Sequence, residues 1–381
     1  MEKILFTPSN TLVAPMKQKI VLYAKNFLLI NELNGIKEYA ASHDLHLVIP
    51  TMFTIRDIVE NWEGDGIITD DDWAVEKLSA RGVKIVALST LDKLLKYADS
   101  IIGTDNEKIG CLCADYFLRR GYRNFAVFID HYGRDEVFKR RIEEHGFSAI
   151  PIISHTLLFN FEELTHIGSQ LKQLPQPCAI FCNNDWQAFF VLQAAKIENI
   201  DVPRQLSVIG VGNASQFGAS AGLSSLDSHD YERGCLAARE MDRLLAGGER
   251  RSTPILVPPG ELIERQSSNQ FAVEDPKLRS IINYLQQHAG EPIRLADTAR
   301  HFNLGESSLL RLFKHFFNQT PKQFLTELRL SNAKRLLRDT KDKIETIAFS
   351  CGFSSPTALY ELFQKRYQRT PESWRKENRN F

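Results

Sequence analysis

The sequence contains 381 residues, of which 43% are hydrophobic and 25% are charged, and its formal net charge is zero. This length allows two or three domains, and the composition is that of a globular protein rather than a disordered or fibrous one. The sequence has no run of 18 apolar residues, and its first ten residues, MEKILFTPSN, turn polar too early for a signal peptide. We therefore expect a cytoplasmic protein with no membrane segment.

The cysteines are scattered along the chain and form no C-x-x-C pair with nearby histidines. This spacing argues against a zinc site and against a disulfide framework, and reduced thiols are the expected state. We predict no metal and no cofactor. The six cysteines are Cys111, Cys113, Cys178, Cys182, Cys235 and Cys351.

Residues 1–17 are predicted to form a tail, after which strand-like and helix-like segments alternate. Amphipathic, helix-like segments lie at residues 31–42, 106–120 and 185–198. This alternation predicts a mostly parallel sheet that is covered by helices on both faces. The strand-like runs occupy residues 19–23, 46–49, 66–69, 84–88, 124–129, 178–182 and 206–210.

Polar side chains follow directly after several of the strand-like runs. Ligands of open α/β sheets bind beyond the carboxyl ends of the strands, so these positions are candidates for a small-molecule site. Each of them also fits a loop turn or a helix N-cap; Asp185, for example, could cap a helix that begins at Trp186. The positions are Asp70, Asp71, Asp130, Asn183, Asn184, Asp185 and Asn213.

Residues 266–276 read as a short polar linker, and an amphipathic helix over 276–288 follows it. Residues 276–381 carry 19 Lys and Arg against 10 Asp and Glu, a net charge of +9, which leaves −9 for the preceding part. A basic segment joined to an acidic one is typical of a nucleic-acid module attached to a domain with another task, although a solvated basic face has the same composition.

Residues 295–324 and 344–374 repeat one pattern at an offset of 49 and then 50 residues. Ala299 matches Ala348, Phe313 matches Phe363, and a Thr-Pro pair recurs at 320–321 and 370–371. The pattern predicts two helix–turn–helix units, at 295–316 and 344–367, within a domain that covers 277–381. Gly305 is expected to supply the unusual backbone angles of the first turn.

Residues 18–265 resemble the effector domain of LacI-type regulators, which has the fold of periplasmic sugar-binding proteins. The resemblance implies two α/β lobes that close around a sugar, chain crossings near 103, 230 and 255, and a homodimer. The run at 255–268 is similar to the closing strand of that family. The matching motifs are GDGIITD (64–70), VKIVAL (83–88), IIGTDNEKIG (101–110), CAIFCNNDWQAF (178–189), VPRQLSVIGVGN (202–213) and LSSLDSHDYERG (223–234).

The same resemblance implies which side chains bind the sugar. Asp185 is expected to accept hydrogen bonds from sugar hydroxyls, and Arg134 to donate several at once. Asn213 stands where the family usually has an aspartate, so its contact departs from the pattern. Trp186 has two readings, a stacking surface for the sugar ring or a core side chain. The full predicted set is Asp70, Asp71, Arg134, Asn184, Asp185, Asn213 and Asp227.

Residues 278–376 resemble the DNA-binding domain of the AraC/XylS family, most closely over LRLSNAKRLLRDTKDKIETIAFSCGFSSPTALYELFQKRYQRTP at 328–371. Arg311 suits a guanine edge, Glu361 a cytosine amino group, and Thr357 or Ala358 a thymine methyl group; a phosphate contact or a surface ion pair remains the alternative for Arg311. The predicted DNA-binding set is Ser307, Ser308, Leu310, Arg311, Lys314, Pro356, Thr357, Ala358, Glu361, Gln364 and Lys365.

These observations predict a multidomain chain: a two-lobed α/β domain of parallel sheets, like periplasmic binding proteins, followed by an all-α tandem helix–turn–helix domain. Together the two resemblances imply a sugar-responsive transcriptional activator of xylose catabolism and transport genes. Its expected partners are double-stranded DNA, D-xylose, RNA polymerase and a second copy of the chain. The alternatives are another sugar, a repressor, or an enzyme. The enzyme is disfavoured because no glycine-rich phosphate loop follows the first strand and no metal-ligating cysteine cluster is present.

Overall fold

The computed structural model describes residues 19–25, 29–50, 55–73, 75–90, 92–129, 133–155, 160–214, 217, 221–273 and 275–378. The predicted tail at 1–17 and Asp130 lie outside these ranges. The chain divides by its contacts into two compact units. The first comprises residues 1–113, 126–174 and 180–269, and the second comprises 114–125, 175–179 and 270–381.

The described residues form two six-stranded sheets, which lie mainly in the first unit. The first sheet has the order β11-β5-β4-β3-β1-β2 with every registered pair parallel. Its central strands are buried on both faces, as their continuous apolar sequences require. Its strands are β1 (Lys19–Ala24), β2 (Leu45–Val48), β3 (Gly66–Thr69), β4 (Lys84–Ala87), β5 (Ser100–Thr104) and β11 (Ile255–Val257).

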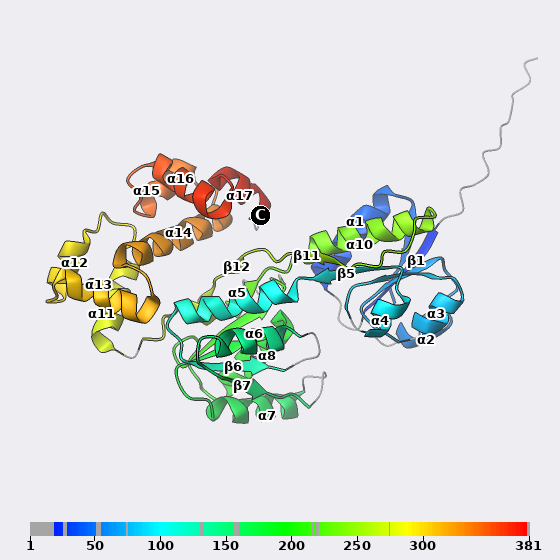
Figure 1. Cartoon of the computed structure of the whole chain (residues 1–381), viewed down its shortest axis with the longest axis horizontal. Helices are drawn as coiled ribbons and strands as arrows, with labels where there is room; N and C mark the ends of the chain where they lie inside the picture. Colours follow the sequence, from blue (N-terminus) through cyan, green and yellow to red (C-terminus); the bar gives the residue numbers. More distant parts are fainter. Residues whose placement is uncertain are drawn as a thin grey trace, which may run out of the picture. The chain divides into compact units, whose positions relative to one another are not determined.

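Helices cover both faces of this sheet (Figure 1). Helix α1 (Ile30–Ser42) and α10 (Asp230–Leu245) lie side by side on one face, and α2 (Ile55–Glu60), α3 (Val75–Ala80) and α4 (Asp92–Tyr97) cover the other. Two glycines allow α1 and α10 to touch, because a Cβ at Gly35 would overlap the carbonyl of Tyr231, and a Cβ at Gly234 would overlap that of Glu32. This close crossing brings Glu32 against the first turn of α10.

The second sheet has the order β12-β10-β9-β8-β6-β7, and β12 pairs antiparallel with β10. Stacking of Phe138 on Phe181 packs α6 on β8, while α7 and α8 contact each other. The elements are α5 (Asn106–Arg119), β6 (Asn124–Phe128), α6 (Arg134–Glu143), β7 (Ala149–Ile152), α7 (Phe161–Lys172), β8 (Cys178–Phe181), α8 (Asp185–Ile197), β9 (Leu206–Val211), β10 (Ser224–Leu226) and β12 (Leu262–Ile263).

The chain passes between the two sheets three times: after β5, after β10, and between β11 and β12. These crossings lie where the family resemblance placed them. The run at 255–268 is not one closing strand, however. It is divided into β11, which ends the first sheet, and β12, which joins the second, followed by the short 3₁₀ helix η1 (Gln266–Ser268).

The second unit is mainly helical, and its described residues include two hydrophobic cores. The first core includes Leu309 and Phe313 with α11, and the second includes Leu359 and Phe363. Helix α14 supplies Phe324 to the first core and Leu330 to the second, and therefore joins them. The helices are α11 (Pro276–Gln287), α12 (Leu295–His301), α13 (Glu306–Phe317), α14 (Pro321–Asp339), α15 (Ile344–Ser350), α16 (Pro356–Tyr367) and α17 (Pro371–Asn378).

The sequence repeat is also a repeat of backbone conformation. Asn303 and Gly352 occupy matching turn positions with φ of 51° and 81°, and Asn318 and Gln368 end the matching helices with φ of 54° and 55°. The expectation for Gly305 is wrong, because it has φ −75° and ψ 152° as the residue before α13. Asn303 is the left-handed residue of that turn, and asparagine tolerates this region better than most side chains.

Candidate effector site and nucleic-acid interface

Asp185 lies at the carboxyl end of β8, in the first turn of α8, and is 3% exposed. Its Oδ1 accepts a 2.5 Å hydrogen bond from the Ser225 hydroxyl, and its Oδ2 accepts a 2.7 Å bond from the backbone N–H of Ala214. Burial raises the pKa of Asp185 to about 6, although these two hydrogen bonds favour the charged form. A carboxylate held in this way is oriented before any ligand arrives.

Asn184, rather than Asp185, caps helix α8: its side chain accepts a 2.8 Å hydrogen bond from Gln187 N–H. Asn213 lies close to Asp185, since its backbone N–H donates to the Ser225 hydroxyl at 2.9 Å. The Oδ1 of Asn213 accepts a 2.8 Å bond from Arg265. Three of the predicted sugar-binding residues are therefore gathered at the ends of β8, β9 and β10.

Arg134 begins helix α6 and its guanidinium binds three segments. Its Nε donates to Asn106 Oδ1 at 2.8 Å, one Nη to the Asn183 carbonyl at 2.6 Å, and the other Nη to Thr104 Oγ1 at 3.0 Å. Arg134 thus links the end of β5 and the start of α5 with the loop that precedes Asp185. A ligand that accepts a hydrogen bond from Arg134 would compete with these three contacts and change how the two segments are connected.

Asp70 lies at the end of β3 among buried charges of both signs. Its Oδ2 is 3.7 Å from Lys25 Nζ, and the same ammonium donates to Glu32 Oε1 at 2.8 Å. Arg233 forms an ion pair with Glu32 and another, at 3.1 Å, with Asp230. These five side chains form the buried charge network.

Burial and the neighbouring cations shift the pKa values of the two carboxyl groups Asp70 and Glu32 in opposite directions. It raises the pKa of Asp70, with Lys25 opposing the effect. Burial would raise the pKa of Glu32 as well, but Arg233 and Lys25 together outweigh it and lower that pKa to about 2. The cations around Glu32 therefore favour its charged form, whereas burial of the Asp70 carboxyl favours its neutral form.

Gly212 lies between the two groups of residues. A Cβ at this position would be 3.7 Å from Asp185 Oδ2 and 3.7 Å from Asp230 Oδ2. The two carboxylates therefore flank the Gly212 backbone, whose φ of 123° also favours glycine. This geometry connects the Asp185 group to the buried charge network through Asp230.

The other predicted positions have local partners. Asp71 accepts a hydrogen bond from Trp73 N–H, and Asp227 accepts one from His229 N–H, each at 2.9 Å, so both side chains close turns. Trp186 is not a core residue: it is 39% exposed and its ring packs against Phe190 and Phe217. Because its ring is exposed, Trp186 can serve as a stacking surface for a sugar ring.

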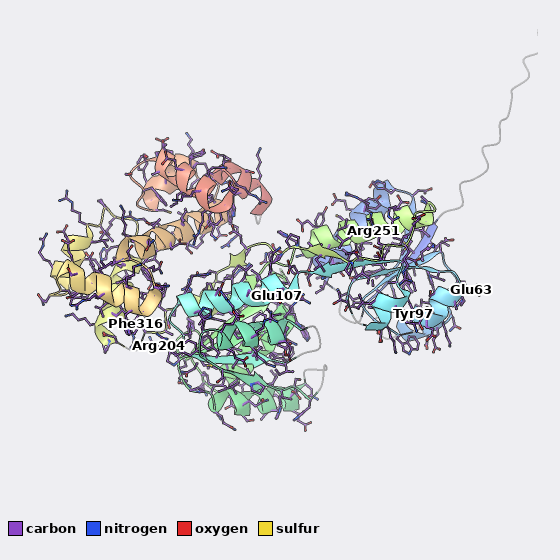
Figure 2. All side chains as sticks on the ribbon, in the orientation of Figure 1. Glu63, Tyr97, Glu107, Arg204, Arg251 and Phe316 are labelled. Atoms are coloured by element: carbon purple, nitrogen blue, oxygen red, sulfur yellow. The ribbon has the colours of Figure 1, made fainter. Side chains whose placement is uncertain are left out.

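Sequence reasoning missed Lys25, Glu32, Asp230 and Arg233. Lys25 follows β1 directly, so the strand-end rule that found Asp70 also applies to it. Glu32 and Arg233 lie on helices, and no local pattern pairs them. A surface cavity of about 540 Å³, lined by Glu63 (labelled in Figure 2) and Lys84, lies at the amino ends of β3 and β4, away from these groups.

In the second unit, the predicted DNA-contact face of α13 is open. Ser307, Leu310, Arg311 and Lys314 are exposed and Ser308 is half-buried, while Leu309 and Phe313 face the core. Arg311 forms no hydrogen bond or ion pair with any residue in the described part of the chain. Phe316, labelled in Figure 2, lies near the end of the same helix and packs on the first core.

Helix α16 has the same organisation. Thr357, Glu361, Gln364 and Lys365 are exposed, Pro356 and Ala358 are half-buried, and Leu359 and Phe363 are buried. Ser355 caps this helix by accepting from Ala358 N–H at 3.2 Å, and Pro356 occupies its first turn. Both helices therefore present an exposed, mainly polar face at the position that enters a groove in helix–turn–helix proteins.

Comparison with known proteins agrees with this two-part organisation. A periplasmic binding protein-like domain matches residues 114–268, and a helix-turn-helix domain matches residues 298–377. A solved structure described as the xylose-binding transcription activator xylR superposes with a TM-score of 0.56 at 25% identity, covering 96% of this chain and 99% of the other.

The chain is a transcriptional regulator that joins a periplasmic binding protein-like domain to a helix-turn-helix domain. Two relatives match this chain over most of their length. The xylose operon regulatory protein of Haemophilus influenzae is 28% identical over 84% of this chain and 87% of its own. That of Escherichia coli strain K12 is 27% identical over 91% and 93%. In the described part of the regulator, no helix is both long and apolar enough to cross a membrane.

Residues of the receptor sequence contribute to the DNA-binding unit of the regulator. The carbonyl oxygen of Arg120, just after α5, accepts a 2.9 Å hydrogen bond from Ala272 N–H, and its guanidinium donates to the Gln270 carbonyl at 3.4 Å. Phe271 packs on Phe317 and Phe324 of the first core. The segment that precedes α11 is thus held by both α5 and the first helix–turn–helix unit.

Proposed function

We propose that this regulator is a transcriptional activator whose effector is a pentose, D-xylose first. The observation that carries the proposal is the oriented Asp185 carboxylate, which lies with Asn213 and Arg265 at the strand ends of a periplasmic binding protein-like domain. Carboxylate and amide groups at fixed positions give directional hydrogen bonds to neutral hydroxyls. The names of the two relatives and of the similar solved structure support xylose over other sugars.

The proposed sugar contacts are those that retain hydrogen-bonding capacity toward a ligand. Asp185 and Asp70 supply carboxylate oxygens, Arg134 supplies donors, and Trp186 supplies an exposed ring. Asn184 uses its oxygen to cap α8 and offers its amide N–H groups. Among the predicted residues, we expect Asp71 and Asp227 to contribute least to sugar binding, because each side chain already closes a turn.

In the proposed mechanism, helix α5 transmits the effector signal. It begins at Asn106, which accepts from Arg134, and ends at Arg119, next to the Arg120 that holds residues 270–272. The helix has 14 residues and spans about 21 Å. A sugar that recruits Arg134 alters the start of this helix, and the helix carries the change to the residues before α11. The sugar shifts the equilibrium only by as much as its affinities for the two states differ.

For the output, we propose that α13 and α16 enter successive major grooves. The predicted DNA-binding residues on the open faces of both helices supply base and phosphate contacts. The AraC-type architecture supports dimeric binding of repeated half-sites and contact with RNA polymerase as further parts of the proposal. Because such a protein acts on the chromosome, we place it in the cytoplasm.

The sugar is tested by titrating the full-length protein with D-xylose, L-arabinose, D-ribose and D-glucose in a calorimeter. D-xylose is expected to bind most tightly, and Arg134→Ala is expected to weaken it at least tenfold. Arg141→Ala, on the same helix with an exposed ion pair to Glu144, is the matched control. If another sugar binds more tightly, that sugar is the effector instead of D-xylose. If none of the sugars binds, the assignment of this domain as a sugar receptor is overturned.

The regulatory output is tested with DNA selected from a random library by the full-length protein. Addition of the bound sugar is expected to strengthen operator binding in a gel-shift titration and to raise transcription from a reporter promoter. Sugar-induced release of the DNA, with higher reporter expression in a strain lacking the gene, would instead identify a repressor.

A further inference from the structure

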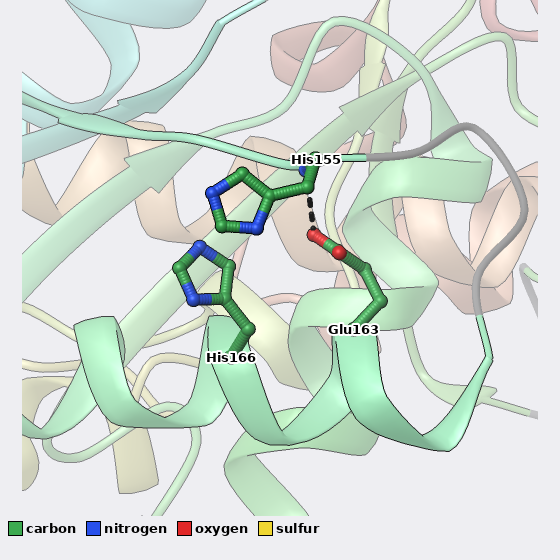
Figure 3. Close-up of side chains that lie close together, drawn as sticks. All are labelled: His155, Glu163 and His166. Atoms are coloured by element: carbon green, nitrogen blue, oxygen red, sulfur yellow. Dashed lines mark hydrogen bonds between the residues drawn. The ribbon is translucent and has the colours of Figure 1, made fainter.

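Two histidines and a glutamate lie together at the start of helix α7, outside the effector site and the DNA-binding helices (Figure 3). One nitrogen or oxygen from each of His155, Glu163 and His166 lies within 4.8 Å of those of the other two. Neither the strand-end rule nor the family resemblance points to these residues. Their side chains converge from two segments, the chain after β7 and the first turns of α7.

The protein holds both segments in place. The backbone N–H of His155 donates to Glu163 Oε1 at 3.0 Å, the bond drawn as a dashed line in Figure 3. Two further bonds between Ile153 and the Gln170 side chain, at 2.8 and 3.0 Å, fix the same segment to α7. Glu163 and His166 are three residues apart and therefore share one face of the helix.

The cluster contains a polar atom that lacks a partner. Glu163 is 4% exposed, and the Nε2 atom of His166 is buried with no hydrogen-bond partner among the described residues. The imidazole rings of His155 and His166 are stacked, with their centroids 4.0 Å apart. A buried ring nitrogen without a partner is unfavourable unless something binds it, and it lies beside a second imidazole and a carboxylate.

This donor set matches one class of ligand. Two imidazole nitrogens and one carboxylate oxygen are typical of catalytic-type Zn²⁺ sites, which leave a fourth position for water. Tetrahedral bonds of about 2.0–2.2 Å place ligand atoms roughly 3.3–3.6 Å apart. The atoms here lie within 4.8 Å of one another, so metal binding requires the exposed His155 side chain to rotate toward the other two ligands.

We propose that His155, Glu163 and His166 bind one divalent transition-metal ion, Zn²⁺ in preference to Mg²⁺ or Ca²⁺. The ion satisfies His166 Nε2 and ties the chain after β7 to α7 more firmly than the existing hydrogen bonds. Hard cations are disfavoured because they select oxygen ligands. The site shares no residue with the proposed sugar contacts or with the DNA-binding helices.

The test uses full-length protein freed of metal with a chelator and titrated with Co²⁺, whose visible absorption reports tetrahedral nitrogen and oxygen ligands. One Co²⁺ per chain is expected to bind and to be displaced by Zn²⁺ but not by Mg²⁺. His166→Ala and Glu163→Gln are expected to weaken binding at least about tenfold, because each removes a ligand. Zn²⁺ should raise the Tm of the unaltered protein and leave that of His166→Ala unchanged.

His145→Ala is the matched control, since His145 is an exposed histidine outside the cluster whose ring contacts the Arg141 carbonyl. Circular dichroism of the metal-free variants checks that they fold. Equal loss of Co²⁺ in His145→Ala and His166→Ala would overturn the proposal, as would no binding by the unaltered protein. A thiolate-to-cobalt charge-transfer band that persists in His166→Ala would also overturn it, by moving the metal to a cysteine.

Discussion

The guanidinium of Arg120 lies over the ring of Phe271, with its central carbon 4.6 Å from the ring centre. The same guanidinium is 4.5 Å from the ring centre of Tyr116, on the last turns of α5. Phe271 in turn packs on Phe324, the α14 residue in the core of the first helix–turn–helix unit. Arg120 therefore connects the end of α5 with the segment that enters the DNA-binding helices.

Replacement of Arg120 by alanine should uncouple the sugar from the DNA. We expect Arg120→Ala to bind both ligands separately but to lose most of the sugar-induced change in operator affinity, since it removes the cation–π contacts and the bond to Gln270. Gel shifts with and without sugar measure this change. Lys108→Ala, which removes an exposed side chain of α5 itself, is the control and should keep the full response. An unchanged response in Arg120→Ala would remove α5 from the mechanism.

Asp185 should make sugar binding depend on pH. Its pKa of about 6 lies above the ordinary value of 3.8, so the acceptor form of the carboxylate is lost as the pH falls through 6. Sugar affinity is expected to decrease from pH 7 to pH 5 in the unaltered protein. Asp185→Asn should bind more weakly at pH 7 and show little dependence over that interval. Calorimetric titrations at several pH values measure both effects.

The Asp185 carboxyl also makes the stability of the protein depend on pH, in the opposite direction to its effect on sugar affinity. Because its folded pKa is raised, Asp185 contributes stability that is full below about pH 4 and is lost as the pH rises through 6. The free energy of unfolding of the sugar-free protein, relative to Asp185→Asn, should therefore fall between pH 4 and 6. Urea unfolding of both proteins checks the sign, and a rise would show that the carboxylate is not buried as described.

Glu32 should stabilise the receptor domain through its partners. Removing one member of a buried ion pair typically costs about 3–5 kcal/mol, so Glu32→Gln and Arg233→Met should each be strongly destabilising. The double variant Glu32→Gln/Arg233→Met should be destabilised by much less than the sum of the two. Urea unfolding of the receptor domain measures the three free energies. Additive effects would mean that the two side chains do not interact.

The pH dependence of this contribution has the opposite sign to that of Asp185. The pKa of Glu32 is lowered from 4.5 to about 2, so its stabilisation is present above pH 4.5 and is lost as the pH falls toward 2. The difference in unfolding free energy between the unaltered protein and Glu32→Gln should shrink over that range.

Arg311 and Lys365 should affect DNA binding in different ways. If Arg311 reads a guanine edge, Arg311→Ala should lose about 1–3 kcal/mol on the selected operator and discriminate less at one base pair. Lys365→Ala should weaken binding to all sequences alike and reduce its dependence on salt, as loss of a phosphate contact does. Lys277→Ala, exposed on α11, is the control. Uniform weakening by Arg311→Ala would assign it to the phosphate backbone.

The sequence by itself determined the architecture, and the predicted fold class is confirmed. Strand and helix periodicity are local signals, and the 49–50-residue repeat placed Phe313 and Phe363 in matching cores. The sequence predicted where the turn between the two helices lies, but not which of its residues has the left-handed conformation. Glycine is the usual residue in a left-handed turn position, which led to the prediction for Gly305. The left-handed position of this turn is two residues before Gly305, at Asn303.

Only the tertiary structure determined which charged side chains are neighbours around the strand ends. Glu32 and Arg233 meet because Gly35 and Gly234 let two helices from opposite ends of the receptor sequence touch, and no local pattern encodes that crossing. Asp230 likewise reaches the Gly212 backbone beside Asp185 only after the chain has returned to the first sheet. Local periodicity specifies which face of an element is buried, whereas the pairing of charges depends on which buried faces are packed together.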